Sequence, residues 1–285
     1  HQHQMKFGCG GLVDTPPGVT CKTQRRGDRS CFAARAFRKG ETILTDIPLM
    51  VAQLQASAER VQACAHCLRY VGTLQSQLAY LSGTDVSALP GVSDKDSQFS
   101  PVVPCRSGCG LLYCSAECEA QAAESHHLLL CDGAAGMCGE EDAPYRAFRE
   151  HARRENESFH LAGIVLASVI ATADTRGVED AMAPYLRLCS GPWWDLVAVP
   201  ADVPERKHAA YRARLRKIAS DSLSLLRRAA TREGRLEGGR KDAAAATLTL
   251  DVFGSLVGSL LLNSLCVDLP SPVKQYLEAL SESGG

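Results

Sequence analysis

The sequence predicts an α+β protein, with a small β-rich segment near its start, a cysteine-rich module after it and a mostly helical region beyond. Three observations favour this order. Short apolar runs separated by turn residues occupy the chain before residue 60. Cysteine pairs crowd between Cys64 and Cys131. From Pro144 onward the pattern becomes helical.

The N-terminal region contains candidate short strands. Cys31–Ala36 and Thr42–Asp46 are predicted to be strands around a turn at 38–41, where Gly40 can adopt the positive φ that such a turn needs. Met50–Leu54 could form a further strand.

The cysteine-rich module is the most informative part of the chain, with seven of the thirteen cysteines and three of the eight histidines. Two or three residues separate the members of each of four pairs, so both members of a pair can reach one metal ion. The pairs are Cys64/Cys67, Cys105/Cys109, Cys114/Cys118 and His127/Cys131. Thiolate and imidazole ligands in fours are typical of tetrahedral Zn²⁺ sites, so the sequence predicts two of them.

A disulfide framework is the alternative for these cysteines. The tight spacing favours metal, and no apolar stretch typical of a secretion signal occurs in the first thirty residues. We therefore expect a reducing, intracellular location, in the nucleus and/or the cytoplasm. The opening HQHQ before Met5 is typical of a tag remnant or a fragment boundary, so 1–17 is treated as a tag remnant or disordered start.

The phrase YCSAEC at Tyr113–Cys118, within this spacing, resembles the MYND zinc finger. The resemblance implies cross-braced ligation. One zinc would bind Cys64, Cys67, Cys114 and Cys118, and the other would bind Cys105, Cys109, His127 and Cys131. His127 is chosen over His126 because it forms HxxxC with Cys131, and His66 is left unligated. Two departures from the family are the three residues between Cys105 and Cys109, where two are usual, and the long insert 68–104.

Asp28–Gln53 resembles the N-terminal segment of SET domains, and a SET segment followed by a MYND finger is the layout of the SET-and-MYND protein-lysine methyltransferases. The long insert resembles a divergent branch with an extended finger. The family transfers the methyl group of S-adenosylmethionine to a lysine ε-amine, on histone or non-histone proteins. By resemblance, a turn at Arg29, Ser30 and Cys31 would cradle the cofactor, although Ser30 stands where glycine is common. Asn263, within LLNSLCVDL, would hydrogen-bond it. The alternatives are an ordinary β-turn at 29–31 and an asparagine whose side chain is satisfied by the backbone.

The family's catalytic half carries an NHSCxPN phrase, a catalytic tyrosine and a cysteine-rich zinc site, and no such phrase follows Asn263. We therefore expect a chain truncated before the catalytic SET core, with no catalytic residue and little activity by itself. The expected domains are 18–60 (N-terminal SET segment), 61–132 (MYND finger), 143–247 (helical insertion) and 248–285 (start of the SET core).

Inside the insert, Val71, Leu74, Leu78 and Leu81 keep helical spacing, and 83–101 has the composition of a mobile loop. Ser115 can cap a short helix in the finger.

Several helices are predicted beyond the finger. Ser158–Thr172 is apolar nearly all round, which predicts a buried helix in which His160 is a core residue. Trp193 and Trp194 are interpreted as packing anchors. Pro204–Thr231 is predicted to be a long helix with a broad apolar face, and Glu237–Ala246 a loop.

Leu248–Val267 is predicted to be a core helix. Only sixteen residues separate Asp251 from Asp268, fewer than the roughly twenty of a membrane span. The small residues Gly254 and Gly258 indicate close helix packing.

Charge distinguishes the remaining functional alternatives. The net charge is −1, so no global field attracts nucleic acid or a membrane. Residues 205–241 hold twelve basic and four acidic side chains, which is typical of a solvated face and leaves a weak nucleic-acid surface as a minority interpretation. The other alternative is an adaptor that binds proline-containing peptides through its finger without catalysis.

Overall fold

The computed structural model describes residues 17–23, 29–45, 48–86, 89, 98–133, 143–188, 190–232 and 234–283. The chain divides into two compact units, His1–Leu49 and Met50–Gly285, and each is described by itself. The proposed tag remnant lies almost entirely outside the described residues.

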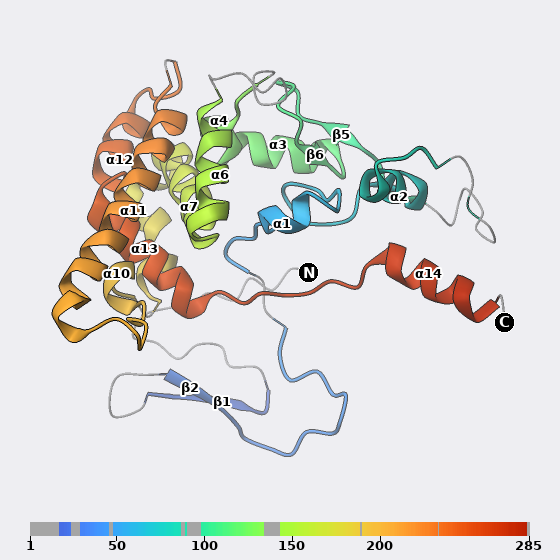
Figure 1. Ribbon diagram of the computed structural model, residues 1–285, viewed down its shortest axis with the longest axis horizontal. Helices are drawn as coiled ribbons and strands as arrows, with labels where there is room; N and C mark the ends of the chain where they lie inside the picture. The colour runs from blue at the N-terminus through green and yellow to red at the C-terminus, as the bar shows by residue number, and fades with distance from the viewer. Residues whose placement is uncertain are drawn as a thin grey trace. The chain divides into compact units, whose positions relative to one another are not determined.

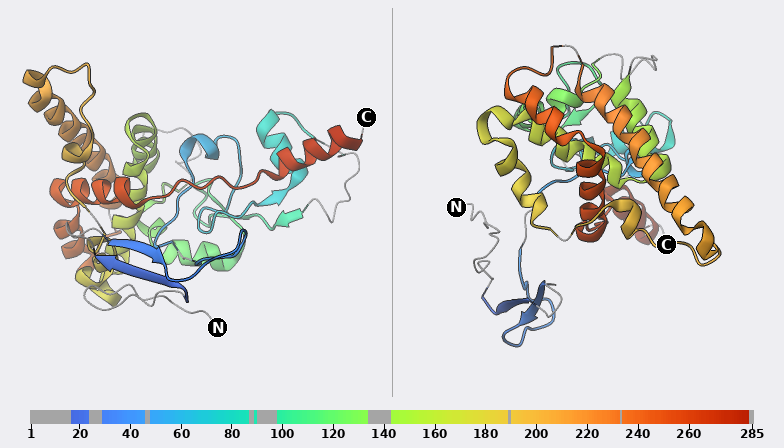
Figure 2. Two further views of the ribbon diagram at one scale, coloured as in Figure 1. Left: turned by 90° about the horizontal axis from the view of Figure 1, so that it is seen from below. Right: turned by 90° about the vertical axis from the view of Figure 1, so that its left-hand side faces the viewer.

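The first unit is built on an antiparallel hairpin of β1 (Val19–Thr23) and β2 (Arg29–Ala33), whose strands lie side by side in Figures 1 and 2. The predicted strand at Cys31–Ala36 is therefore correct only in its first half. The turn at 38–41 is confirmed, since Glu41 N–H donates to Arg38 O at 3.0 Å and Gly40 has a φ of 83°.

The predicted strand at Thr42–Asp46 is wrong for its described residues, which form no strand; Asp46 lies outside them. The physical reason is that strand β2 pairs with a segment before it in the chain and not with 42–45. β2 pairs with the upstream Val19–Thr23, and the Glu41 carboxylate instead closes the turn on itself by accepting from Arg38 N–H and pairing with Arg35. The predicted strand at Met50–Leu54 is also wrong, because Met50 and Ala52 pack against the helical core instead.

The cysteine-rich module of the second unit consists of short helices and strands joined by turns. They are α1 (Gln55–Ala58), β3 (Gly72–Thr73), α2 (Leu74–Ser82), β4 (Gln98–Ser100), β5 (Val103–Pro104), β6 (Leu112–Tyr113), α3 (Ala116–Glu124) and α4 (His127–Leu130). The pairs β3–β4 and β5–β6 are antiparallel.

The helix expected in the insert begins at Leu74, later than predicted, because Thr73 and Ser76 form a reciprocal capping box there. Val71 is fully buried in the core of the cysteine-rich module instead. Of the predicted loop at 83–101, only 83–86, 89 and 98–101 are described, and Gln98–Ser100 is a strand rather than a loop because it pairs with β3.

The helical layer follows, and its elements are drawn from green to red in Figure 1. They are α6 (Pro144–Glu155), α7 (Ser158–Ala171), α8 (Ala173–Arg176), α9 (Val178–Leu186), α10 (Trp193–Leu196), the 3₁₀ turn η1 (Glu205–Lys207), α11 (His208–Ala230), α12 (Gly239–Thr247) and α13 (Leu250–Asn263). The last helix, α14 (Pro272–Ser283), packs instead against α2 of the cysteine-rich module.

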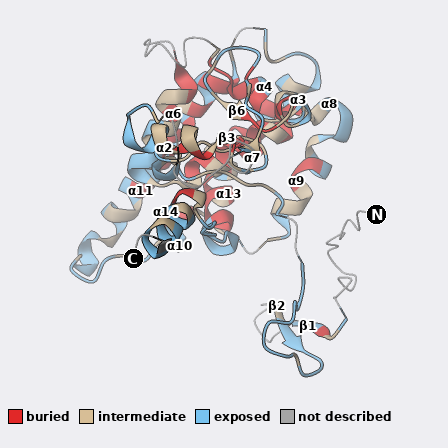
Figure 3. Cartoon of the chain, turned by 90° about the vertical axis from the view of Figure 1, so that its right-hand side faces the viewer, coloured by how far each residue is buried: buried red, intermediate tan, exposed pale blue. Residues whose placement is uncertain are grey.

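The core of this layer is the predicted buried helix α7, most of which is coloured as buried in Figure 3. It packs against α4, α6, α12 and α13. Phe159 meets Trp193 edge-on, with ring centroids 4.9 Å apart, and lies 5.7 Å from Phe253. Both tryptophans are buried, which confirms their interpretation as packing anchors.

Glu237–Ala246 was expected to be a loop, and that prediction is wrong, because 239–247 is helix α12. Its alanines have the highest helix propensity of any residue. Ala243 and Ala244 are buried against the core, and Asp174 accepts a hydrogen bond from Gly239 N–H at 2.8 Å. These tertiary contacts and the alanine run outweigh the two glycines that suggested a loop.

Helix α13 occupies 250–263 of the predicted Leu248–Val267, with its apolar face buried. No single helix among the described residues is both long and apolar enough to cross a membrane. Helices α12 and α13 meet the length and composition criterion only as a pair, and they are bent by 72° at the break between them.

His160 is a core residue, as predicted, and its surroundings give a pH prediction. Its Nδ1 lies 3.1 Å from Gln55 Nε2 and its Nε2 lies 2.9 Å from the Tyr145 hydroxyl. Burial, with the nearby Arg149 and His126, lowers the pKa of His160 to about 3. In the unfolded chain the pKa of this histidine is about 6.5. Between pH about 3 and about 6.5 the ring is therefore neutral in the folded protein and protonated in the unfolded chain.

Between those two pKa values the unfolded chain binds a proton that the folded chain refuses. We therefore expect stability to fall as the pH drops from about 6.5, by up to about 1.4 kcal/mol per pH unit from this group. Urea unfolding at several pH values, compared between wild type and His160→Gln, measures the difference. Identical pH slopes in the two proteins, at equal zinc content, would contradict it.

Candidate metal centres

The eight predicted ligands gather into the two expected groups. Within each group the sulfur and nitrogen atoms all lie within 4.8 Å of one another. The first group is Cys64, Cys67, Cys114 and Cys118, and the second is Cys105, Cys109, His127 and Cys131. The described cysteines form no disulfide.

The separations fit a tetrahedral zinc ion. With Zn–S near 2.3 Å and Zn–N near 2.0 Å, a tetrahedron places two sulfurs about 3.8 Å apart and a sulfur and a nitrogen about 3.5 Å apart. In the first group, Cys114 Sγ lies 3.5 Å from both Cys67 Sγ and Cys118 Sγ. In the second group, Cys105 Sγ lies 3.8 Å from Cys131 Sγ, and Cys109 Sγ lies 3.5 Å from His127 Nε2. The donor sets therefore fit Zn²⁺ at both centres.

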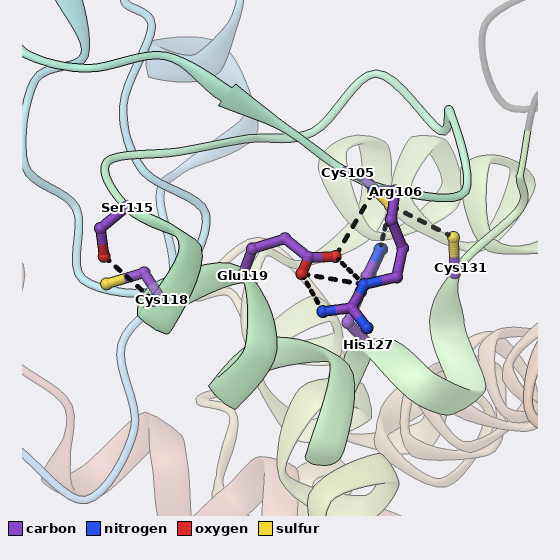
Figure 4. Close-up of polar contacts among 7 residues, drawn as sticks. All are labelled: Cys105, Arg106, Ser115, Cys118, Glu119, His127 and Cys131. Carbon is purple, nitrogen blue, oxygen red and sulfur yellow. Dashed lines mark hydrogen bonds and ion pairs between the residues drawn. The ribbon is translucent and has the colours of Figure 1, made fainter.

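The first centre is shaped by a tight turn and a helix cap. Leu68 N–H donates to Cys64 O at 2.9 Å, and Leu68 has a φ of 63°, so the chain folds back immediately after Cys67. On the opposite side, the Ser115 hydroxyl accepts from Cys118 N–H at 3.2 Å (Figure 4), which confirms the predicted cap of α3. Cys118 is thereby fixed in the first turn of that helix.

The second centre explains the unusual spacing of its first pair. Cys105 and Cys109 lie in the loop that joins β5 to β6, where Gly108 N–H donates to Cys105 O and Cys105 N–H donates to Leu111 O, both at 2.9 Å. Gly108 has a φ of 72°. This left-handed residue lets the loop hold three residues between the two cysteines and still turn both thiols toward one position.

Electrostatics favour a thiolate at some positions of each centre and a protonated thiol at others. The Cys131 thiolate raises the pKa of Cys109, and burial raises the pKa values of Cys114 and Cys118. Burial raises the pKa of Cys64, but N–H groups of Cys67, His66 and Cys114 donate to its sulfur and the net pKa is lowered. A hydrogen bond from the Cys109 thiol lowers the pKa of the Cys131 thiol to about 3. A hydrogen bond from His127 acts in the same direction, and burial acts in the opposite direction. Metal ligation requires deprotonated thiols, so a cation bound at either centre would have to displace the protons that the thiols with raised pKa values retain.

His127 and His126 are separated by the structure as the HxxxC spacing predicts. His127 Nε2 lies 3.2 Å from Cys105 Sγ, whereas His126 Nδ1 faces the Ser125 hydroxyl at 3.3 Å and belongs to neither group. Burial and the neighbouring His127 and His66 lower the pKa of His126 to about 4. His126 is thus a half-buried neutral ring beside the centre.

We expect His127→Ala to release one zinc ion per chain and His126→Ala to release none. Only His127 points a ring nitrogen at the thiols, and a four-coordinate site that loses a ligand binds metal far more weakly. Atomic emission on the two purified variants, beside wild type, measures this. Equal zinc loss, or loss from His126→Ala alone, would contradict the assignment.

An ion pair that no sequence motif indicates braces the second centre. The Glu119 side chain is only 7% exposed, and both of its oxygens accept from the Arg106 guanidinium, with Nε donating at 2.8 and 2.9 Å (Figure 4). Arg106 directly follows the ligand Cys105, and Glu119 directly follows the ligand Cys118. The pair therefore fixes the two centres relative to each other. The Arg106 side chain lowers the pKa of Glu119, so the carboxylate stays charged.

A second feature of this kind ties this centre to the helical layer. The backbone carbonyl of Cys131 accepts hydrogen bonds from Arg232 and Arg235. Asp132, next in the chain, accepts from Tyr145 N–H at 3.1 Å and Arg146 N–H at 2.8 Å, at the start of α6. Arg232 also pairs with Asp132 at 3.1 Å. No local sequence pattern signals these contacts, because they join residues up to about a hundred positions apart.

Much of the local positive charge noted in the sequence is used within the fold. Arg212 pairs with Asp195, Lys217 with Asp221 and Arg240 with Asp174. These pairs agree with a solvated helix face. The nucleic-acid interpretation remains an untested prediction.

The expected cofactor residues belong to different compact units. Arg29, Ser30 and Cys31 begin strand β2 instead of forming the expected turn, because they pair with Thr23, Lys22 and Cys21. Asn263 ends α13, where its Nδ2 donates to Ser259 O at 2.7 Å. Their role in cofactor binding remains a prediction.

Comparison with known proteins points to lysine methylation. The chain is 24% identical over 326 aligned residues to the Arabidopsis thaliana histone-lysine N-methyltransferase ATXR2, covering 91% of this chain and 66% of the relative. It is 36% identical over 111 residues to the mouse protein-lysine N-trimethyltransferase SMYD5, covering 37% of this chain and 25% of the relative. The zebrafish SMYD5 aligns over 57% of this chain at 28% identity. Neither a family model nor a solved structure matches the chain.

The chain thus spans about two-thirds of the Arabidopsis relative and a quarter of the mouse relative. These relatives support assignment to the lysine methyltransferases as a group. They do not favour the adaptor alternative.

Proposed function

We propose that this chain is the zinc-finger and helical part of a SET-and-MYND type protein-lysine N-methyltransferase that uses S-adenosylmethionine. The observation that carries the proposal is the alignment with a lysine methyltransferase over 91% of the chain. The two tetrahedral donor sets support it, because a MYND finger requires two such sites. The expected domain boundaries at 18–60, 61–132, 143–247 and 248–285 belong to the same proposal.

Both zinc ions would be structural. Four protein ligands surround each position, so no coordination site is open for a substrate or a water molecule. Their task would be to hold the finger as a rigid element. The Arg106–Glu119 pair joins the two centres, and Asp132 joins the second to α6, so the finger would keep a fixed orientation to the helical layer.

S-adenosylmethionine supplies an electrophilic methyl group when bound. In the proposal, Arg29, Ser30 and Cys31 present backbone groups to its methionine end, and Asn263 adds a side-chain hydrogen bond. The hydrogen bond from Asn263 to Ser259 O holds that amide in one orientation, which would reduce the entropy lost on binding. The proposed substrate is a lysine of a histone or non-histone protein, and the proposed location is the nucleus and/or the cytoplasm.

A segment exchange tests the function. This chain replaces the segment of the Arabidopsis relative that it matches, and the product is assayed for transfer of labelled methyl groups to histones and to a mixed protein extract. We expect transfer above background, lost when Cys105→Ser is introduced. A folded, zinc-loaded product without transfer would argue against the proposal.

Residues 1–285 alone make a complementary sample. The proposed cofactor contacts in this chain are few, and a ligand only partly enclosed is bound weakly. We expect calorimetry to show weak S-adenosylmethionine binding and the methyl-transfer assay to show no turnover. Micromolar binding or clear turnover by this chain alone would place the active site elsewhere in it.

A further inference from the structure

Two cysteines outside the metal centres face each other in the first unit. Cys21 of β1 and Cys31 of β2 are direct partners in the antiparallel register, and their sulfur atoms lie 3.0 Å apart. A disulfide bond would need about 2.04 Å, so the two thiols are in contact but not bonded. Neither residue belongs to a metal-ligand group among the described residues.

The hydrogen-bond pattern of the hairpin places this pair at a favourable position for a disulfide. Ala34 N–H donates to Gly18 O at 2.8 Å, so that pair is hydrogen-bonded. Antiparallel strands alternate hydrogen-bonded and non-hydrogen-bonded pairs. Cys21 and Cys31 are the third pair along the register from Gly18 and Ala34, so they form a non-hydrogen-bonded pair.

Such pairs bring their Cα atoms to about 4.5 Å, with the side chains closer than in hydrogen-bonded pairs. Disulfides span Cα separations of about 4.4 to 6.8 Å, so the bond can form without moving the strands apart. Cys31 is exposed and Cys21 is half-buried, so small thiol reagents can reach the pair.

We propose that Cys21 and Cys31 form a redox-active dithiol, which a small-molecule disulfide such as glutathione disulfide converts reversibly into an intramolecular disulfide. The Cys31 thiol loses its proton, and the thiolate attacks one sulfur of glutathione disulfide, breaking its S–S bond and releasing one glutathione thiolate. The Cys21 thiolate then attacks the Cys31 sulfur and releases the second glutathione.

The two cysteines lose two electrons in total, and glutathione disulfide gains them. The two cysteine protons end on the two glutathione molecules. Exposed disulfides are more readily reduced than buried structural ones, so the same reaction runs backwards when reduced glutathione is in excess.

A consequence for methyl transfer rests on the proposed function. Cys31 is one of the three residues proposed to line the cofactor, so oxidation ties a cofactor-lining residue to the neighbouring strand. S-adenosylmethionine binding should therefore weaken when the disulfide forms. Calorimetry on the reduced and oxidised forms of the segment-exchange protein measures this separately from the disulfide itself.

The experiment uses the zinc-loaded 285-residue chain, equilibrated without oxygen in buffers of graded ratios of glutathione disulfide to glutathione. After acid quenching, N-ethylmaleimide blocks the remaining thiols and trypsin digests the protein. Mass spectrometry then seeks the linked peptides Phe7–Lys22 and Ser30–Arg35. Fragmentation distinguishes a link through Cys21 from one through Cys9, which lies on the same peptide.

We expect the Cys21–Cys31 link to form while two zinc ions per chain are retained, to disappear with dithiothreitol and to be absent from Cys31→Ser. Cys266→Ser, which removes an exposed cysteine of the other unit, should leave its yield unchanged. Recovery of Cys31 as a glutathione adduct beside a maleimide-labelled Cys21 would overturn the proposal, as would a Cys9–Cys31 link. An unchanged cofactor affinity after complete oxidation would overturn only the consequence for binding. Failure of the reduced exchange protein to bind cofactor would count against the proposed function alone.

Discussion

Cys105→Ser should destabilise the helical layer, whereas Cys67→Ser should loosen the cysteine-rich module alone. Each substitution removes one ligand from a different centre, so each variant should retain about one of two zinc ions. The contrast arises because the two centres are attached differently. Cys131, a ligand of the second centre, is bonded through its carbonyl to Arg232 and Arg235 of the helical region.

Asp132 extends this attachment, because it accepts from two backbone N–H groups at the start of α6 and pairs with Arg232. Structural zinc in small fingers contributes roughly 10–16 kcal/mol of binding free energy, against total domain stabilities of about 5–15 kcal/mol. Even a fraction of this transmitted to the helices would lower their melting temperature by about 10 °C or more, at about 2–4 °C per kcal/mol.

Tryptophan fluorescence provides the measurement, because both tryptophans of the chain lie in α10 of the helical layer. Thermal melts followed by this signal should show a large fall for Cys105→Ser and a small one for Cys67→Ser, with atomic emission confirming equal zinc loss. Equal falls in the two variants would mean that the attachment through Cys131 and Asp132 carries little energy.

The grouping of the eight candidate ligands could be predicted from the sequence because each pair sits within one local turn. Cys64 and Cys67 flank a single reversal, and Cys118 lies three residues after its helix cap, so spacing alone determines which side chains converge. The buried helix α7 was predictable for a similar reason, since its composition leaves no polar face to expose.

The errors concern choices between distant partners. Strand β2 pairs with the upstream Val19–Thr23, and nothing in 42–45 indicates that it would be left unpaired. Helix α12 forms although its glycines favour a loop, because Asp174 accepts a hydrogen bond from its first turn and its alanines pack in the core. The braces at Glu119 and Asp132 are equally invisible locally, because carboxylates at such positions are usually solvated.

Gly258→Ala should be among the most destabilising single substitutions in the helical layer. An ordinary exposed helical glycine gains up to about 1 kcal/mol from the same change, because alanine is the better helix former. At residue 258 the same change should lower the stability instead. A Cβ at residue 258 would lie 2.0 Å from the backbone oxygen of Gly191 and 2.8 Å from Leu196 Cδ1. A backbone oxygen cannot rotate away, so α13 and the segment before α10 must separate.

Overpacking of this kind costs about 1–3 kcal/mol, and more where the obstacle is rigid, so we expect a loss near or above the upper limit. Gly254 offers an internal comparison, because its added Cβ would meet the Trp194 ring at 2.4 Å, and that side chain has more freedom to shift. The loss should therefore be smaller for Gly254→Ala than for Gly258→Ala. Ser255→Ala, on the same helix, should change stability little. Urea unfolding of the three variants gives the order, and a Gly258→Ala protein as stable as wild type would show that α10 and α13 are not in the close contact seen here.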